Sequence, residues 1–204
     1  WLVIQDVSSL GRSTRLRGIK IPRQYEFLSD LERNYFYLLE YSDLVVDIRE
    51  QFPLLPLEET QIIAEELGIK HPTHPQTKEP IVMTTDFVVT KMEQGKPVNL
   101  ARTLKYKDDL MDKRIIEKFE IEREYWERKG IDWGIVTELE VPKEMAMNIS
   151  FAHSYADLSS IEDFSEFSED DIDTFSVYLI SDLLNVEMTV RETCTRLDEV
   201  FYLA

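Results

Sequence analysis

Apolar residues recur along this chain at the spacings of both helices and strands. Spacings of three or four residues predict helices over residues 29–40, 57–67, 109–129, 143–149, 174–184 and 190–201. Alternating or β-branched runs predict strands over residues 2–8, 13–20, 44–48, 81–90, 98–104 and 132–137. The polar pair Gln94-Gly95 between two of these strands indicates a hairpin. This order of elements favours an α/β fold in which helices flank a mixed sheet.

The pattern changes after Pro142. A stretch rich in Ser, Asp and Glu at residues 154–173 is typical of a linker or an exposed acidic segment. We therefore predict a boundary near residue 150, with one domain at residues 1–149 and another at residues 150–204. The two helices predicted beyond this boundary are too short to bury a core of their own, so we expect the second domain to be incomplete.

The composition excludes several classes of protein. A chain of 204 residues holds one ordinary domain and at most a small companion. No apolar run approaches the roughly 18 residues that a membrane span needs, so we expect no membrane association. None of the 6 glycines belongs to a phosphate-binding motif, so ATP-driven work would need a partner. The single cysteine, Cys194, and the lack of a signal peptide predict a cytoplasmic protein.

Charge is distributed unevenly along the chain, whose formal net charge is -17. Residues 151–204 hold 13 acidic and 2 basic residues, which is a net charge of -11 for that segment. Residues 7–25 contain no Asp or Glu, and their cations are Arg12, Arg15, Arg17, Lys20 and Arg23. This spacing suits contacts with DNA phosphates, although a solvated basic hairpin without a ligand explains it equally well.

Three acidic residues occupy positions where the pattern calls for an apolar side chain. Asp86 lies within the strand pattern of residues 81–89, and Glu32 and Glu122 continue the apolar stripes of two helices. A buried carboxylate is costly unless it is paired or binds a cation. Each helical position also has a structural explanation. Glu32 completes an S-x-x-E capping box with Ser29, and Glu122 could pair with Lys118 or Arg123.

The strand predicted at residues 98–104, next after the strand of Asp86, favours a functional role for these acids. It ends with Thr103, Leu104 and Lys105, and alternation places Thr103 and Lys105 on the same face. Metal-dependent phosphodiesterases commonly use an Asp on one strand and (D/E)-x-K on the next, because carboxylates hold Mg²⁺ and the ammonium stabilises the charged phosphate. Thr103 leaves this pattern one carboxylate short, and Glu32 is the natural replacement.

We therefore expect Glu32 and Asp86 to converge on one Mg²⁺ or Mn²⁺ ion, with Lys105 pointing to the same place. The backbone carbonyl of Leu104 is a further candidate oxygen ligand for the cation. We also expect Arg12, Arg15, Arg17 and Lys20 to form a basic strip for DNA on the side of Lys105.

Several strings of this sequence resemble the TnsA endonucleases of heteromeric cut-and-paste transposons. The most specific are DIREQFPLL at residues 47–55 and the long-helix string at residues 117–126. Shorter matches lie at residues 1–3, 9–12, 28–32, 68–72 and 85–87. The resemblance covers most of residues 1–140.

The resemblance implies a restriction-endonuclease-like fold that cuts the 5′ ends of a transposon, while an RNase-H-type transposase cuts the 3′ ends. It places the family's catalytic acids on Glu32 and Asp86, its catalytic lysine on Lys105 and a further acidic position on Glu122. It also implies a winged-helix-like C-terminal domain, of which residues 150–204 would cover part. That domain would engage a TnsB-like transposase and a TnsC-like AAA+ ATPase regulator, at the nucleoid of a bacterial cell.

Two other functions remain open at this point. The same chemistry serves a restriction-type or junction-resolving endonuclease of the same fold. A non-catalytic adaptor of a transposition complex would use the acidic tail to recruit partner proteins, but an adaptor gains nothing from buried, unpaired carboxylates.

Overall fold

The computed structural model describes residues 13–158, 161, 164, 166–185 and 188–201. The chain divides into two compact units, Trp1–Ser154 and Tyr155–Ala204. The strand predicted at residues 2–8 lies outside the described residues.

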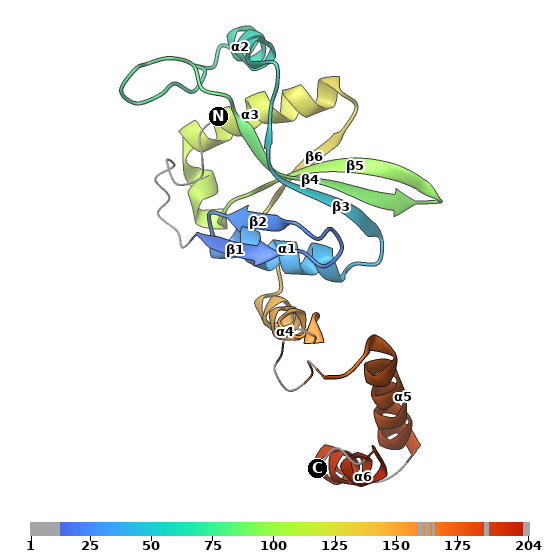
Figure 1. Cartoon of the computed structure of the whole chain (residues 1–204). Coiled ribbons are helices and arrows are strands. Elements are labelled where there is room, and N and C mark those ends of the chain that lie inside the picture. Colours follow the sequence, from blue (N-terminus) through green and yellow to red (C-terminus); the bar gives the residue numbers. More distant parts are fainter. Residues whose placement is uncertain (1–12, 159–160, 162–163, 165, 186–187, 202–204) are drawn as a thin grey trace. The chain divides into compact units, whose positions relative to one another are not determined.

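A four-stranded sheet forms the centre of the first unit (Figure 1). Its strands, in spatial order, are β3 (Val45–Pro53), β4 (Thr84–Glu93), β5 (Lys96–Leu104) and β6 (Asp132–Val136). The first three are antiparallel, and β6 runs parallel to β5. A separate two-stranded ribbon consists of β1 (Thr14–Arg17) and β2 (Gln24–Phe27). The predicted mixed α/β sheet is confirmed, whereas β2 was not anticipated as a strand of its own.

Helices cover both faces of this sheet (Figure 1). They are α1 (Asp30–Tyr41) on one face and α2 (Leu57–Glu66) and α3 (Lys113–Arg128) on the other, while α4 (Lys143–His153) packs against α1. On one face, Phe27 and Phe36 of β2 and α1 pack against Phe87 of the sheet. On the other face, residues of α2 and α3 such as Ile63 and Trp126 bury the opposite side of the strands. Each face therefore has its own apolar core.

Local sequence signals explain where most of these elements begin and end. Ser29 caps α1, since its hydroxyl accepts the backbone N–H of Glu32. Gln94 and Gly95 both have positive φ, at 50° and 76°, as a tight hairpin turn between β4 and β5 requires. The helix predicted from residue 109 begins at Lys113 instead, because the side chain of Asp112 caps it after a short 3₁₀ helix, Lys107–Met111.

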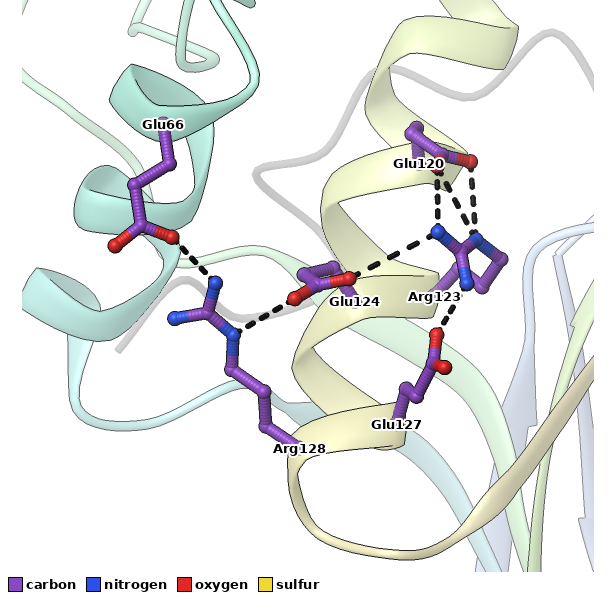
Figure 2. A network of polar contacts seen from close by, with 6 residues as sticks. All are labelled: Glu66, Glu120, Arg123, Glu124, Glu127 and Arg128. Carbon is purple, nitrogen blue, oxygen red and sulfur yellow. Dashed lines mark hydrogen bonds and ion pairs between the residues drawn. The ribbon is translucent and has the colours of Figure 1, made fainter.

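The outer side of α3 carries a network of ion pairs, which we call the paired network (Figure 2). Its members are Glu66, Glu120, Arg123, Glu124, Glu127 and Arg128. Arg123 bonds to Glu120 at 2.7 Å and also to Glu127 within α3. Arg128 bonds to Glu124 at 3.0 Å and to Glu66 of α2, so the network joins the two helices.

The helix α4 belongs to the first unit. Ile149 packs against the core beneath α1, and the ring of His153 makes an edge contact with Tyr37 at 5.4 Å between centroids. The helix thus continues past the boundary predicted near residue 150, and the compact units divide after Ser154.

The second unit contains helices α5 (Glu169–Asn185) and α6 (Val190–Phe201). The helix predicted from residue 174 begins earlier, because Ser168 and Asp171 form a capping box in which the Asp171 N–H donates to the Ser168 hydroxyl at 3.2 Å. Phe175 of α5 and Phe201 of α6 are in edge contact. Among the residues described, no helix is both long and apolar enough to span a membrane.

Candidate active site

In β3, the alternation of side chains between the two faces of the sheet is interrupted at Gln51. Glu50 bonds to Arg23 near β2, whereas Phe52, two residues later, packs against Trp126 of α3 on the opposite face. Residues two apart in a regular strand share a face. Gln51 lies between them with a φ of 47°, a left-handed conformation that non-glycine residues rarely adopt. The inversion of the strand is therefore located at Gln51.

The neighbouring strand β4 makes the same change at Asp86. Phe87 belongs to the core beneath α1, but the Thr85 hydroxyl accepts a 2.7 Å bond from the indole of Trp126 on the other face. The β4–β5 ladder ends at Phe87. Beyond it, Asp86 Oδ2 accepts the backbone N–H of Leu104 at 2.7 Å, so a side chain replaces the expected ladder acceptor. The side chain of Asp86 thus lies where the two strands part.

Glu32 reaches the same place from the first turn of α1. Ser29 Oγ donates to Glu32 Oε1 at 2.8 Å, and the Leu28 N–H donates to Glu32 Oε2 at 3.0 Å. The Glu32 N–H also donates to Ser29 Oγ at 3.2 Å, so Glu32 takes part in capping the helix, although its carboxylate accepts the N–H of Leu28 where a capping box would use that of Ser29. Glu32 is nevertheless buried, with 8% of its surface exposed. Glu32 therefore both caps the helix and faces inward, so the two interpretations of this residue do not exclude each other.

One amide joins the two carboxylates. Gln51 Nε2 lies 3.4 Å from Glu32 Oε2 and 3.3 Å from Asp86 Oδ1. The two oxygens are thus no farther apart than the sum of these distances, which is less than the limit of about 8 Å beyond which rigidly held carboxylates could not share one cation. The two carboxylates thus lie within the distance that the predicted shared cation requires, and their role as metal ligands stays a prediction.

Glu32 is buried and Asp86 is partly buried, and no cationic side chain contacts either of them among the described residues. Burial therefore has the largest effect on their pKa values. Burial raises the pKa of Asp86 to about 8, and the nearby carboxylate of Glu32 adds to the rise. Burial also raises the pKa of Glu32, against the lowering effect of its hydrogen bonds. Among the described residues, neither carboxylate forms an ion pair. The pair is therefore held by neutral donors and has room for a positive charge.

Glu122 brings a third buried carboxylate from α3. Its Oε1 accepts hydrogen bonds from the Thr85 hydroxyl at 2.6 Å, from the Trp133 indole at 3.0 Å and from the Thr103 hydroxyl. The alternative ion pair with Arg123 is wrong, because Arg123 belongs to the paired network, and no pair with Lys118 forms among the described side chains. Burial raises the pKa of Glu122 as well.

This arrangement accounts for the missing acid of the (D/E)-x-K pattern. Thr103 is buried and bonded to Glu122, so the helix supplies a carboxylate beside the position where β5 lacks one. Glu122 is also near enough to Asp86 to raise the pKa of that residue, after burial and Glu32.

The three carboxylates and Lys105 border one cleft of about 360 Å³. Its polar lining residues are Glu32, Thr84, Asp86, Thr103, Lys105, Lys118 and Glu122. Lys105 lies in the cleft wall, where its charge lowers the pKa of Glu32, and its Nζ is 3.4 Å from Asp109 Oδ2 at the rim. Leu104 donates its N–H to Asp86, and ligation by its carbonyl stays a prediction.

The residues present fit a hard divalent cation that is completed by other ligands. Mg²⁺ is commonly held by one or two carboxylates together with substrate phosphate and water. Within the described part of the chain, no three side chains of His, Cys, Asp or Glu gather into a self-sufficient metal site. The carboxylates of Glu32 and Asp86 supply the oxygen donors that such a shared cation requires.

The basic strip is only partly visible. Arg12 lies outside the described residues, and Arg15 is paired with Glu26 at 2.9 Å. Arg17 is exposed, and the backbone N–H of Lys20 donates to Glu40 at 3.3 Å. Their expected position on the side of Lys105 stays a prediction.

Two family models match consecutive parts of the chain. "TnsA-like endonuclease N terminal" matches residues 42–138, and "TnsA endonuclease C terminal" matches residues 140–204. The chain is also 43% identical over 154 residues to the Transposon Tn7 transposition protein TnsA of Escherichia coli. The chain belongs to the TnsA endonuclease family. The alignment covers 76% of the chain and 55% of the relative, so the chain spans about half the length of that TnsA protein.

The N-terminal TnsA match includes most, but not all, of the residues of the candidate site. Asp86, Lys105 and Glu122 lie within the N-terminal TnsA match, whereas Glu32 precedes it. Gln51 also lies within the match, in the DIREQFPLL string, and sequence reasoning gave it no role. Its positive φ and its two carboxylate contacts identify it only in three dimensions.

Proposed function

We propose that this chain is the endonuclease subunit of a cut-and-paste transposition system. It hydrolyses phosphodiester bonds at the 5′ ends of a transposon and uses Mg²⁺, for which Mn²⁺ can substitute. The observation that carries the proposal is the meeting of Glu32 and Asp86 on one amide, in a cleft that Lys105 also lines. Membership of the TnsA family and the similarity to the Tn7 transposition protein TnsA support the transposition role.

The side chains divide the work in this proposal. Glu32 and Asp86 hold the cation, together with the carbonyl of Leu104. A bound Mg²⁺ lowers the pKa of water and neutralises charge on the phosphate. Lys105 stabilises the negative charge that develops on the phosphate or helps to deprotonate the attacking water. Glu122 adds a third carboxylate to the wall of the cleft, where Thr85 and Thr103 fix its orientation.

A cleavage assay tests the proposal directly. Duplexes that carry the ends of the chain's own transposon are incubated with the chain and its transposase, in Mg²⁺ or in EDTA. We expect nicks at the 5′ ends of the transposon in Mg²⁺ alone. Equal cutting of an unrelated duplex would favour a restriction-type enzyme, and preference for a four-way junction would favour a resolvase.

The DNA is expected to lie along the strip formed by Arg12, Arg15, Arg17 and Lys20. Arg17→Ala should weaken binding to all duplexes alike and reduce the slope of log K against log salt by about one, because one phosphate contact is lost. Arg15→Ala should have a smaller effect, since Glu26 already pairs with that guanidinium. An unchanged slope in both variants would assign these residues to the solvated surface.

The partners in this proposal are a TnsB-like transposase and a TnsC-like AAA+ ATPase. Residues 151–204 carry a net charge of -11, from 13 acidic and 2 basic residues, so this segment is unsuited to the DNA backbone. We expect it to bind partner proteins. Deletion of residues 155–204 should preserve stabilisation of the first unit by Mn²⁺ and abolish partner-dependent cleavage. Normal cutting by the truncated chain in the reconstituted complex would remove the docking role.

A further inference from the structure

Gln51 lies behind two acidic residues of the cleft wall, where its amide contacts both Glu32 and Asp86, and its backbone has a conformation that non-glycine residues rarely adopt. Its φ of 47° suits glycine, and a glycine there would allow β3 to turn over with less strain. The backbone alone therefore gives no reason for a glutamine. What a glycine would lack is the amide that contacts Glu32 and Asp86.

The orientation of this amide is fixed by its neighbours. Thr84 Oγ1 donates to Gln51 Oε1 at 3.3 Å, which leaves the NH₂ group to face the two carboxylates. The two amide hydrogens can each serve one carboxylate, since an NH₂ group has two donors. Gln51 therefore bridges side chains from α1 and β4 that have no other contact of this kind among the described residues.

The bridge opposes the repulsion between the carboxylates. Two negatively charged oxygens at this separation repel each other, and an NH₂ group that contacts both offsets part of that repulsion. The amide thereby favours an arrangement in which both carboxylates lie close to one point.

The other donors leave the carboxylates well oriented for a cation. Asp86 receives Leu104 N–H on Oδ2 and Gln51 on Oδ1, and Glu32 receives Leu28 and Gln51 on Oε2. If each carboxylate oxygen has two lone-pair sites, these bonds fill Glu32 Oε2, and Ser29 takes one site of Glu32 Oε1. One acceptor site then stays free on Glu32 Oε1 and one on each oxygen of Asp86. The contacts from Gln51, at 3.3 Å and 3.4 Å, are long for N–H···O bonds, so the amide can withdraw slightly as a cation enters.

We propose that Gln51 is a positioning residue of the metal site, whose amide holds the carboxylates of Glu32 and Asp86 close enough to bind one divalent cation. This inference rests on the proposed metal-dependent nuclease function. It adds a residue that bonds to both proposed ligands and orients them. Groups that orient metal ligands in this way typically contribute 10- to 100-fold in metal affinity.

The test separates the amide from the backbone. Gln51→Gly removes the side chain and retains the left-handed backbone. The matched control is Gln94→Gly, which makes the same substitution at a similar φ of 50° in the exposed β4–β5 turn. Mn²⁺ affinity of the full chain is measured by calorimetry, and metal-free thermal melts verify that each variant is folded.

We expect Gln51→Gly to bind Mn²⁺ about 10- to 100-fold more weakly than the unsubstituted chain, and Gln94→Gly to bind it equally well. Gln51→Asn is the second variant, since Asn tolerates positive φ but its shorter amide cannot span both carboxylates; it should weaken binding similarly. Equal affinity in both Gln51 variants would overturn the role of Gln51 alone. If the unsubstituted chain bound no Mn²⁺, the proposed metal site and this inference would both fail.

Discussion

The carboxylates of the paired network and those of the cleft, to both of which α3 contributes, differ in what surrounds them. In the paired network, Glu120, Glu124 and Glu127 each meet an arginine, and the hydrogen bond from Arg123 lowers the pKa of Glu120 (Figure 2). In the cleft, Glu122 and its neighbours meet hydroxyl, indole and amide donors, and burial raises their pKa.

Arginines thus pair with the partly exposed carboxylates of the paired network, whereas among the described residues no arginine pairs with the buried carboxylates of the cleft. A lone buried carboxylate is normally costly, and a packed apolar residue would be more stable in its place. The cleft keeps Glu32, Asp86 and Glu122 without a cation in contact among the described side chains. The paired network contributes little to stability because its groups are partly exposed, whereas the buried carboxylates of the cleft lower the stability of the metal-free fold. We propose that a bound cation supplies the charge that the cleft lacks.

The largest expected effect comes from Asp86→Asn. The amide can still accept the Leu104 N–H but cannot supply negative charge to a cation, so cleavage should fall on the order of 1,000-fold. Metal-free stability at pH 8 should rise, with a melting temperature about 2 to 4 °C higher for each kcal/mol gained. Gel-based cleavage and thermal melts measure the two effects. A variant that lost activity and also stability would break the contrast between the two regions.

Lys105→Ala is expected to reduce the rate of cleavage about 100-fold or more, because a proton-transfer or charge-stabilising group is lost. Stabilisation by Mn²⁺ should persist, since the carboxylates remain. Single-turnover cleavage and Mn²⁺-dependent melts separate these effects. Loss of Mn²⁺ stabilisation would instead make Lys105 part of the structural support of the site.

The pH dependence of metal-free stability sharpens the comparison further. Asp86 has a folded-state pKa of about 8, above its unfolded value of about 3.9. As pH rises through this window the unfolded chain loses the proton first, so the free energy of unfolding should fall between about pH 4 and pH 8. Urea titrations in EDTA should show a smaller fall for Asp86→Asn than for the unsubstituted chain. Parallel curves would mean that Asp86 titrates normally.

The smallest effect is expected in the paired network. Arg123→Gln removes bonds to Glu120 and Glu127, but all of these groups are largely exposed, so the free energy of unfolding should change by less than about 1 kcal/mol. Cleavage should be unchanged. A loss of cleavage in this variant would show that the outer side of α3 takes part in the reaction or in assembly.

Much of the fold was predictable because local signals agree with tertiary packing. Ser29 caps α1 as expected, the turn at Gln94-Gly95 joins the expected strands, and α6 has the predicted bounds. Failures occurred where a local signal misled. The strand predicted over residues 44–48 was too short, since β3 continues to Pro53, opposite Thr84, where a proline is tolerated at a strand end. The acidic residues before 174 suggested a linker, although acidic residues also stabilise the first turn of a helix.

The carboxylates of the site could be predicted from the sequence, but the side chains that donate hydrogen bonds to them could not. Asp86, Glu32 and Glu122 stood out because charge on an apolar stripe breaks the pattern. The partners of Glu122 could not be inferred, since Thr85, Thr103 and Trp133 come from three separate strands. Gln51 left no signal, because a positive φ and a strand inversion depend on tertiary packing.

The bond from the Leu104 amide to Asp86 makes that single N–H a natural spectroscopic probe of the cleft. Its acceptor is a side-chain carboxylate, whereas a regular strand would present a peptide carbonyl. The proton and nitrogen chemical shifts of this amide should therefore respond to any change in charge on Asp86. In an NMR titration, one backbone resonance would report occupancy of the site without a label in the cleft itself.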